Sequence, residues 1–273
     1  MKCTLIGHPL GHSLSPDIHK KLFELSGKGG EYDLTDIEKG NLESKIESLK
    51  KLDGFNVTIP YKTDIIPFLD SLDKTAERYG AVNCVATKNG ESKGYNTDCI
   101  GFIRSLEASG LSLSGRTLLL GCGGVGRMMA AEALIHGGKL TVAVLEEEIP
   151  HAKEVIATLQ DSENAAVVSL DKISGEYDLL VNSTPVGMFP KVDFSPVGES
   201  VVSSCGAMFD AIYNPVKTKL MKLFEKEGKT AVGGMAMLVY QAVAAHEIWY
   251  GASFNENDIA AIIEQMNEKI RNN

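Results

Sequence analysis

In the first part of the chain, short apolar runs alternate with segments in which an apolar residue recurs every three or four positions. This pattern predicts strands that alternate with helices. Short apolar runs, typical of buried strands, occupy residues 2–7, 31–37, 55–59 and 81–87. Apolar residues recur every three or four positions, as on one face of a helix, at Ile18, Leu22 and Leu25 and again at Leu42, Ile46 and Leu49. Asn89-Gly90 follows the last of these runs and predicts a β-hairpin.

The residues that flank these patterns predict helix boundaries. Ser15 is expected to cap the first helix, with Pro16 at its first position and Gly27 after its end. A further helix is expected over residues 98–109, with Asp98 as its N-cap.

The second part of the chain predicts a βαβ unit. An apolar strand at 116–120 runs directly into Gly121-Cys122-Gly123-Gly124-Val125-Gly126, and a helical pattern and a strand at 140–145 follow. Further strands are expected at 178–182 and 207–210, and helices near 216–227, 234–250 and 256–270.

Gly121, Gly123 and Gly126 have the spacing of a dinucleotide-binding turn. A phosphate must approach backbone N–H groups closely, and a side chain would block it. The helix N-terminus adds about half a positive charge. The strand before these glycines and the helix after them favour a dinucleotide site over the alternative, a tight turn without a ligand.

The strand that follows ends in Glu146-Glu147-Glu148, where a dinucleotide enzyme contacts the adenosine ribose. A carboxylate accepts a hydrogen bond from the 2′-hydroxyl of NAD but repels the 2′-phosphate of NADP. The acidic run therefore either selects NAD or is a solvated loop.

Composition excludes several classes of protein. The 273 residues suffice for about two domains, and the net charge of −9 argues against a nucleic acid or an anionic membrane surface as the main partner. The five cysteines form no CxxC pair and have no zinc spacing, which suits a reducing compartment and predicts no metal site. Since no apolar stretch approaches about 18 residues, no membrane span is expected and the predicted location is cytoplasmic.

Three polar segments are candidates for chemistry, and each has a structural alternative. Lys62 follows a strand that Pro60 ends, so it is either a functional residue at the edge of a sheet or an ordinary surface lysine. Asp98 either only caps a helix or also contacts a substrate. Ser13 offers a second hydroxyl beside Ser15 near a helix N-terminus, which suits a carboxylate ligand.

The order of these segments resembles the shikimate dehydrogenase family over nearly the whole chain. The resemblance depends on Ser13-Leu14-Ser15-Pro16, Asn56-Val57-Thr58-Ile59-Pro60-Tyr61-Lys62, Ala81-Val82-Asn83-Cys84, Asn96-Thr97-Asp98, the glycine loop, Asn182-Ser183-Thr184-Pro185-Val186-Gly187-Met188, Asp210-Ala211-Ile212-Tyr213-Asn214-Pro215 and Gly233-Gly234-Met235-Ala236-Met237-Leu238-Val239-Tyr240-Gln241.

The resemblance implies a role for individual residues. Ser13 and Ser15 would bind the substrate carboxylate, and Lys62, paired with Asp98, would transfer the proton. Contacts to the ring hydroxyls would come from Thr58, Asn83, Asp98 and Gln241, with Tyr213 also at the substrate site. The cofactor would contact Gly121, Gly123, Gly124, Val125 and Gly126 at its pyrophosphate, Glu146 at its adenosine ribose, and Ala211 and Gly234 at its nicotinamide half.

Two departures from the family pattern bear on specificity. The family's Asn-Arg-Thr, which grips the 2′-phosphate of NADP, is replaced here by the acidic run, so NADP is the family default while the residues favour NAD. The residues Tyr95 and Cys99 also replace the usual neighbours of Asn96-Thr97-Asp98.

The expected fold is α/β, with an N-terminal α/β substrate-binding domain and a Rossmann-like dinucleotide-binding domain. The first would comprise residues 1–103 plus 237–273 and the second 104–236, with the active site in the cleft between them. The expected activity is reversible, nicotinamide-dependent reduction of 3-dehydroshikimate to shikimate in aromatic amino acid biosynthesis, by a monomer or homodimer. The alternatives are an NAD-dependent quinate/shikimate dehydrogenase and a non-catalytic sensor of a shikimate-like ligand.

Overall fold

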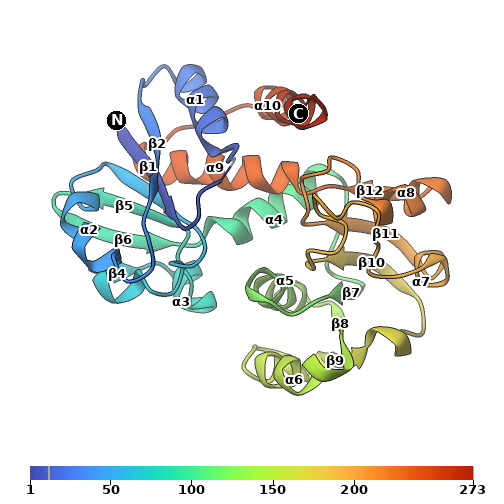
Figure 1. The fold of residues 1–273 in the computed structure, drawn as a ribbon. Helices are drawn as coiled ribbons and strands as arrows, with labels where there is room; N and C mark the ends of the chain where they lie inside the picture. The colour runs from blue at the N-terminus through green and yellow to red at the C-terminus, as the bar shows by residue number, and fades with distance from the viewer. Residues whose placement is uncertain (12, 273) are drawn as a thin grey trace. The chain divides into compact units, whose positions relative to one another are not determined.

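The computed structural model describes residues 1–11 and 13–272, which form two compact units (Figure 1). Unit 1 comprises Met1–Gly101 and Leu238–Met266. Unit 2 comprises Phe102–Met237 and the residues that follow Met266. Each unit has its own six-stranded sheet, so the predicted α/β fold class is confirmed.

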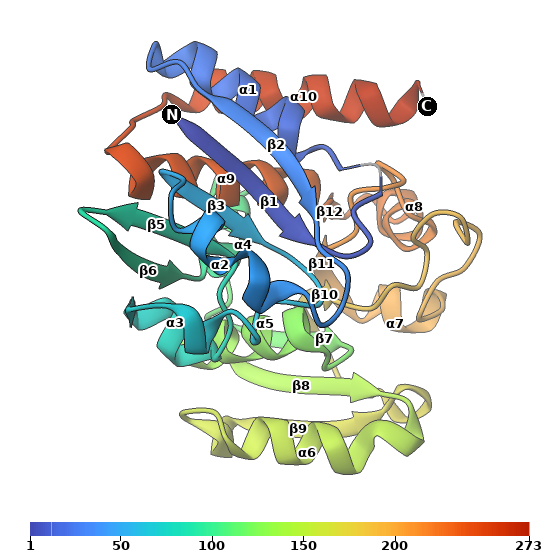
Figure 2. The same ribbon diagram turned by 60° about the vertical axis from the view of Figure 1, so that its left-hand side comes forward.

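The sheet of unit 1 mixes parallel and antiparallel strands in the order β2-β1-β3-β5-β6-β4. The strands are β1 (Lys2–Gly7), β2 (Glu31–Asp36), β3 (Gly54–Val57), β4 (Ser71–Leu72), β5 (Cys84–Lys88) and β6 (Glu91–Tyr95). Strand β1 pairs in parallel with β2 and β3 on either side (Figure 2), whereas β5 is antiparallel to both β3 and β6. Asn89 and Gly90 adopt positive φ angles of 54° and 85° in the β5–β6 turn, as predicted for an Asn-Gly hairpin.

Helices cover both faces of this sheet. The helices that lie wholly or partly in unit 1 are α1 (Ser15–Ser26), α2 (Leu42–Leu49), α3 (Lys74–Tyr79), α4 (Thr97–Ala108), α9 (Met235–Tyr250) and α10 (Glu256–Arg271), with a short 3-10 helix at Ile66–Phe68. Because side chains of a strand alternate between the two faces, Cys3 of β1 packs with Phe23 and Trp249, while Ile6 packs with Ile46 and other residues of the opposite face. Burial of each large apolar side chain contributes roughly 1.5–3 kcal/mol to folding.

The face under α1 and α9 contains two fully buried histidines, His19 and His246. Their ring nitrogens Nδ1 and Nε2 lie 2.9 Å apart, and Nδ1 of His246 lies 2.5 Å from the hydroxyl of Tyr250. The Tyr250 hydroxyl donates in turn to Ser26. In this series of hydrogen bonds one neutral imidazole ring donates to the other, so both histidines are accommodated in their uncharged form. Burial lowers the pKa of His19 well below its usual value and that of His246 to about 3.

The sheet of unit 2 is parallel throughout, in the order β12-β11-β10-β7-β8-β9. Its strands are β7 (Arg116–Leu120), β8 (Lys139–Val144), β9 (Ala165–Ser169), β10 (Tyr177–Asn182), β11 (Cys205–Asp210) and β12 (Thr230–Val232). Its helices are α5 (Gly124–Ile135), α6 (Ile149–Ala157), α7 (Glu199–Ser203) and α8 (Lys219–Lys226), with 3-10 turns at Glu146–Glu148, Ser162–Asn164 and Leu170–Lys172.

Helices α5 and α6 contact β7, β8 and β9, whereas α7 and α8 contact β11 and β12 (Figure 1). With both faces covered, strands such as β7 are apolar on both sides, which explains the uninterrupted Leu118-Leu119-Leu120. The strand order reverses between β7 and β10. In parallel α/β sheets the carboxyl ends of strands at such a reversal form the binding edge.

Two predicted helix caps are wrong. The N-cap of α1 is Leu14 rather than Ser15, whose N–H instead donates to the Ser13 hydroxyl at 3.2 Å. Helix α4 begins at Thr97, so Asp98 lies inside the helix and is not its cap. The side chain of Asn96 accepts the N–H of Asp98 at 3.1 Å instead. Asn96 does the capping, so the Asp98 carboxylate is left for another contact.

The buried histidine pair predicts loss of stability on acidification. In the folded state both pKa values are depressed, so the unfolded chain binds more protons between the folded value and about 6.5. Stability is therefore retained above about pH 6.5 and falls as the pH drops, by up to about 1.4 kcal/mol per pH unit for each histidine. Urea unfolding at pH 7.5 and 5.5 measures this slope.

The variant His246→Gln should show a shallower pH dependence than the wild type. Replacement of the exposed His151 by Gln is the matched control and should keep the wild-type slope. Equal slopes for His246→Gln and the wild type would contradict the assignment.

Candidate active site

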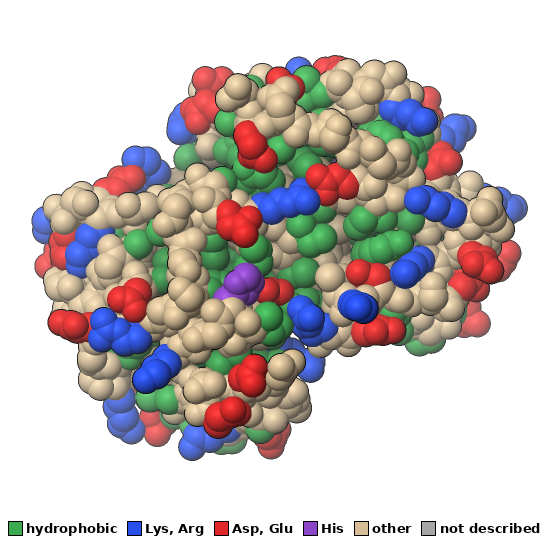
Figure 3. Space-filling model, turned by 180° about the vertical axis from the view of Figure 1, so that it is seen from behind, with side chains coloured by type: hydrophobic (Ala, Val, Ile, Leu, Met, Phe, Trp, Pro, Cys, Tyr) green, Lys and Arg blue, Asp and Glu red, His purple; other side chains and the backbone are tan. Residues whose placement is uncertain are grey.

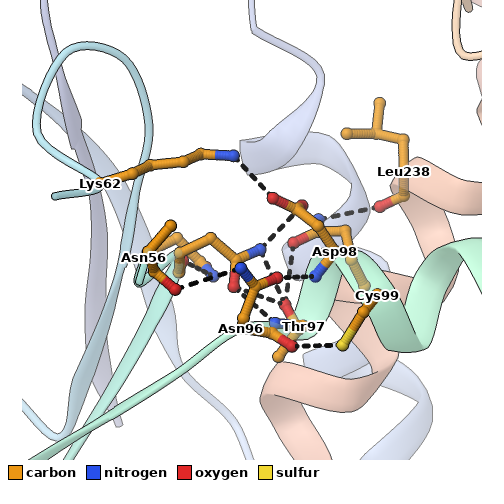
Figure 4. A network of polar contacts seen from close by, with 10 residues as sticks. Asn56, Lys62, Asn96, Thr97, Asp98, Cys99 and Leu238 are labelled. Carbon is orange, nitrogen blue, oxygen red and sulfur yellow. Dashed lines mark hydrogen bonds and ion pairs between the residues drawn. The ribbon is translucent and has the colours of Figure 1, made fainter. Parts of the chain in front are cut away.

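Lys62 lies in the loop after β3, and hydrogen bonds of the Lys62 backbone and of the neighbouring Tyr61 hold this loop in place. The buried Tyr61 donates its hydroxyl to the Ile37 carbonyl at 2.7 Å, and the Lys62 carbonyl accepts the N–H of Val82 at 2.7 Å. The Lys62 ammonium lies 2.6 Å from Oδ2 of Asp98 (Figure 4). The side chains of Lys62 and Asp98 are 27% and 18% exposed, so this ion pair is sheltered but can be reached by a small molecule.

Asn83, in the segment before β5, holds the second oxygen of the Asp98 carboxylate. Its Nδ2 donates to Asp98 Oδ1 at 2.8 Å. The N–H of Thr97 donates to Asn83 Oδ1 at 2.6 Å, which identifies the oxygen end of the amide, because a backbone N–H cannot accept. The sequence-predicted residues Lys62, Asn83 and Asp98 therefore form one connected group.

The backbone of Asn83 is held by a residue that sequence reasoning did not assign to the site. Nδ2 of Asn56, on β3, donates to the Asn83 carbonyl at 3.0 Å, and its Oδ1 accepts the Tyr32 hydroxyl at 2.8 Å. Asn56 is buried. The signal that could have found it is a polar residue within the apolar run 55–59, a position where burial requires hydrogen-bond partners.

Gln241, on α9, joins the same group through Thr97. Its Nε2 donates to the Leu238 carbonyl at 2.9 Å, and its Oε1 lies 3.4 Å from the Thr97 hydroxyl. Thr97 is fully buried, and its hydroxyl also accepts from Asn83 Nδ2 at 3.0 Å.

The remaining predicted substrate residues of unit 1 lie on two loops. The Ser13 hydroxyl accepts the Ser15 N–H, and Thr58 donates its N–H to the Ile6 carbonyl at 2.9 Å. Gly7 is needed beside Thr58, because a Cβ there would lie 2.5 Å from Thr58 Cγ2. Within the described residues no hydrogen bond joins Ser13, Ser15 or Thr58 to the Lys62–Asp98 pair.

The glycine loop of unit 2 connects β7 to α5, with Gly123 as the N-cap of that helix. Gly121 has a φ of +88°, which favours glycine. A Cβ on Gly126 would lie 2.6 Å from Ser183 Oγ and 3.0 Å from the Gly121 carbonyl oxygen. Gly121 and Gly126 therefore form the turn and its close packing.

Gly123 and Gly124 differ from these two glycines, because both are exposed and an added Cβ would meet nothing within 4 Å. They leave open space at the helix N-terminus, and Val125 follows in the first turn. These residues fit a dinucleotide pyrophosphate, which needs backbone N–H groups, an open approach and a positive helix end.

Glu146 follows β8 in a 3-10 turn and is 65% exposed. Its carboxylate lies 3.4 Å from the Lys172 ammonium, a surface ion pair that contributes little to stability. The carboxylate is therefore free to exchange this partner for a ribose hydroxyl.

At the ends of β10 and β11, Asp210 is fully buried and accepts hydrogen bonds from Asn182, Thr218 and the N–H of Ile212. Burial raises the pKa of Asp210 to about 6. The next residue, Ala211, lies against Gly234, where a Cβ would be 2.3 Å from the Ala211 carbonyl oxygen. Tyr213, two residues further on, is exposed.

Other classes of site find no support in the described part of the chain. No three His, Cys, Asp or Glu side chains there are placed to hold a metal ion. None of the described helices has the length and apolar character to cross a membrane. On the face drawn in Figure 3, Lys and Arg side chains are interspersed with Asp and Glu rather than gathered into one basic area.

The glycine loop generates a stability prediction. Gly126→Ala should lower the free energy of unfolding by about 1–3 kcal/mol, because its Cβ meets backbone that cannot move freely. Gly123→Ala, with open space around its Cβ, should change it by less than about 1 kcal/mol. Denaturant unfolding of both variants measures the difference, and an equal loss in the two would refute this division of roles.

Comparisons with known proteins identify relatives of this chain. Residues 5–85 match the family model of the shikimate dehydrogenase substrate binding domain. A shikimate dehydrogenase (NADP(+)) of Caldanaerobacter subterraneus is 38% identical over 93% of this chain and 92% of its own length.

Two solved structures extend the likeness to the whole fold. The shikimate 5-dehydrogenase of Thermus thermophilus in complex with NADP(H) and shikimate is 30% identical, with a TM-score of 0.87 over 97% of this chain and 99% of that chain. A chorismate mutase/shikimate 5-dehydrogenase fusion protein of Clostridium acetobutylicum is 35% identical, with a TM-score of 0.89 over 99% of this chain and 98% of that chain. The length and level of this identity show that the chain belongs to the shikimate dehydrogenase family.

Proposed function

We propose that this protein catalyses the reversible, nicotinamide-dependent interconversion of 3-dehydroshikimate and shikimate. The observation that carries the proposal is the 2.6 Å contact between Lys62 and Asp98, with Asn83 on the other carboxylate oxygen. The two charged groups are partly exposed at the end of a buried polar network, so a small molecule can reach them. The names of the relatives favour neither a quinate enzyme nor a sensor.

Lys62 acts on the oxygen that changes charge. When bound, the nicotinamide of the cofactor supplies a hydride to the ring ketone. The Lys62 ammonium donates a proton to the ketone oxygen as negative charge develops there, and in the reverse direction Lys62 accepts the hydroxyl proton. Asp98 orients Lys62, because its carboxylate accepts from the ammonium at 2.6 Å.

The other predicted residues would hold the substrate. Asn83, Asp98 and Gln241 present amide and carboxylate groups in one connected cluster, which suits ring hydroxyls. Thr58 would add a hydroxyl contact, and Ser13 and Ser15 would bind the carboxylate near the start of α1. Tyr213 would be a further substrate contact.

The cofactor would lie along the carboxyl edge of the parallel sheet in unit 2. The loop from Gly121 to Gly126, which includes Val125, would hold the pyrophosphate, because Gly123 and Gly124 leave the helix N-terminus open. Ala211 and Gly234, which lie against each other, would face the nicotinamide half. This placement follows the general rule for the strand-order reversal of doubly wound sheets.

The test is an absorbance assay of reduced nicotinamide with shikimate, and separately with quinate, in the presence of NADP or NAD. We expect turnover of shikimate by the wild type and loss of more than about 100-fold in kcat for Lys62→Ala, since general acid–base catalysis contributes about 10²–10⁴-fold. Cofactor affinity, measured by fluorescence titration, should be unchanged in this variant.

Each other outcome has a defined meaning. Full turnover by Lys62→Ala would remove the proton-transfer role. Preference for quinate would favour the quinate/shikimate alternative, and ligand binding without turnover under either cofactor would favour a sensor.

We also propose that the acidic run Glu146–Glu148 makes NAD the preferred cofactor, although relatives are named for NADP(+). Three carboxylates at the end of β8 repel a 2′-phosphate, and the carboxylate of Glu146 is exposed to a ribose. Glu146→Arg should therefore shift the ratio of kcat/KM for NADP to that for NAD upward by roughly 10-fold or more, the size of one charge-assisted contact.

Glu163→Arg is the matched control, because Glu163 is an exposed glutamate before the opposite, amino end of a strand of the same sheet. It makes the same charge change and should leave the ratio unaltered. An equal shift in both variants would assign the effect to net charge, and no shift in Glu146→Arg would refute selection by this residue.

A further inference from the structure

Thr97 occupies a central position in the site, although neither the sequence pattern nor the mechanism gives it a role. It is fully buried at the first position of α4, next to Asp98. It lies between two residues proposed to hold the substrate, which come from segments 14 and 144 positions away in the chain: Asn83 and Gln241. We propose that the Thr97 hydroxyl is a positioning group that orients the Gln241 side-chain amide and accepts the second amide proton of Asn83, so that both residues are held in place for the substrate; this inference rests on the proposed function.

The hydrogen-bond directions around Thr97 follow from its neighbours. The Thr97 N–H donates to Asn83 Oδ1 at 2.6 Å, so Asn83 Nδ2 must point the other way. That nitrogen has two protons, and its two acceptors are Asp98 Oδ1 at 2.8 Å and the Thr97 hydroxyl at 3.0 Å. Both protons of the Asn83 amide are thereby assigned.

The proton of the Thr97 hydroxyl is the last one to be assigned between Asn83, Thr97 and Gln241. Having accepted from Asn83 Nδ2, the hydroxyl has one proton to donate, and two acceptors lie within reach: Asn83 Oδ1 at 3.2 Å and Gln241 Oε1 at 3.4 Å. Because Asn83 Oδ1 already accepts the Thr97 N–H, donation to Gln241 Oε1 satisfies both amides, and Gln241 Nε2 donates to the Leu238 carbonyl. This fixes which end of the Gln241 amide is oxygen. A single hydroxyl thus connects the amide that orients Asp98 with the amide on α9.

Loss of the hydroxyl should alter the site more than the fold. In Thr97→Val the shape is kept, but Asn83 Nδ2 loses an acceptor and Gln241 Oε1 loses a donor in a buried place. The Gln241 amide is then able to rotate, whereas the Asn83 amide, whose oxygen the backbone N–H of residue 97 still holds, keeps one buried N–H without an acceptor. The KM for shikimate should rise and kcat should fall, with kcat/KM reduced roughly 10- to 100-fold, the ratio expected for one unsatisfied buried polar group. The KM for the cofactor should not change, because Thr97 contacts only residues of unit 1 in these hydrogen bonds.

Two further variants separate positioning from general stability. Thr97→Ser keeps the hydroxyl and should restore kcat/KM to within about threefold of the wild type. Thr117→Val is the matched control, because Thr117 is equally buried, on β7, and its Oγ1 has no hydrogen-bond partner among the described residues. It should leave all kinetic constants unaltered, and thermal unfolding of every variant monitors the fold.

The experiment measures steady-state constants for shikimate and cofactor, and the shikimate dissociation constant by calorimetry. Unchanged constants in Thr97→Val, or equal impairment of Thr97→Ser and Thr97→Val, would overturn the role of the hydroxyl. If the wild type binds shikimate without turnover, the dissociation constants of the variants decide the question instead. A wild type that neither binds nor converts shikimate would refute the proposed function, and this inference with it.

Discussion

The orientation of one buried amide, that of Asn83, determines the arrangement of the candidate site. A backbone N–H at the start of α4 holds its oxygen at 2.6 Å, and this leaves its nitrogen to face the Asp98 carboxylate. If the amide were rotated, its oxygen would face a carboxylate and an N–H would face an N–H, each at hydrogen-bond distance. In a buried place both errors are costly, because neither group can turn to water. The amide is therefore held in one state, and with it the carboxylate that holds Lys62.

Burial is graded across this cluster in a way that suits chemistry. The supporting residues Asn56, Asn83 and Thr97 are buried, whereas Lys62 and Asp98 are partly exposed. Hydrogen bonds among buried groups are not weakened by competing water, so they set positions firmly. The charged pair at the end of the network remains accessible to a small molecule, and its charges avoid the penalty of full desolvation.

Unit 2 reaches its binding geometry by different means. Its glycine loop uses the absence of side chains: Gly121 and Gly126 allow a tight turn, and Gly123 and Gly124 leave the end of α5 open. The acidic turn after β8 uses side-chain charge instead. Backbone shape fits the pyrophosphate, which every dinucleotide carries, whereas the negative charge of this turn opposes the one phosphate that distinguishes NADP from NAD.

The sequence alone determined the fold class, the family and the main chemical groups, because these depend on local patterns. Hydrophobic period marks strands and helices, the Asn89-Gly90 turn requires its particular backbone angles, and the glycine loop follows a strand and opens a helix. Several elements carried too little pattern to be predicted, among them the short helix α3, the strand β4 and the edge strand β12.

Tertiary structure decided which group performs each task. Local propensity allowed Ser15 and Asp98 as helix caps, yet Leu14 and Asn96 stand at those places. Asp98 instead contacts Lys62, which lies 36 residues away in the chain. The roles of Asn56 and Thr97 were likewise beyond the sequence, because each depends on a partner from another segment: Tyr32 and Asn83 for Asn56, and Asn83 and Gln241 for Thr97. A hydrogen bond between segments is a property of their packing, and no local pattern of residues encodes it.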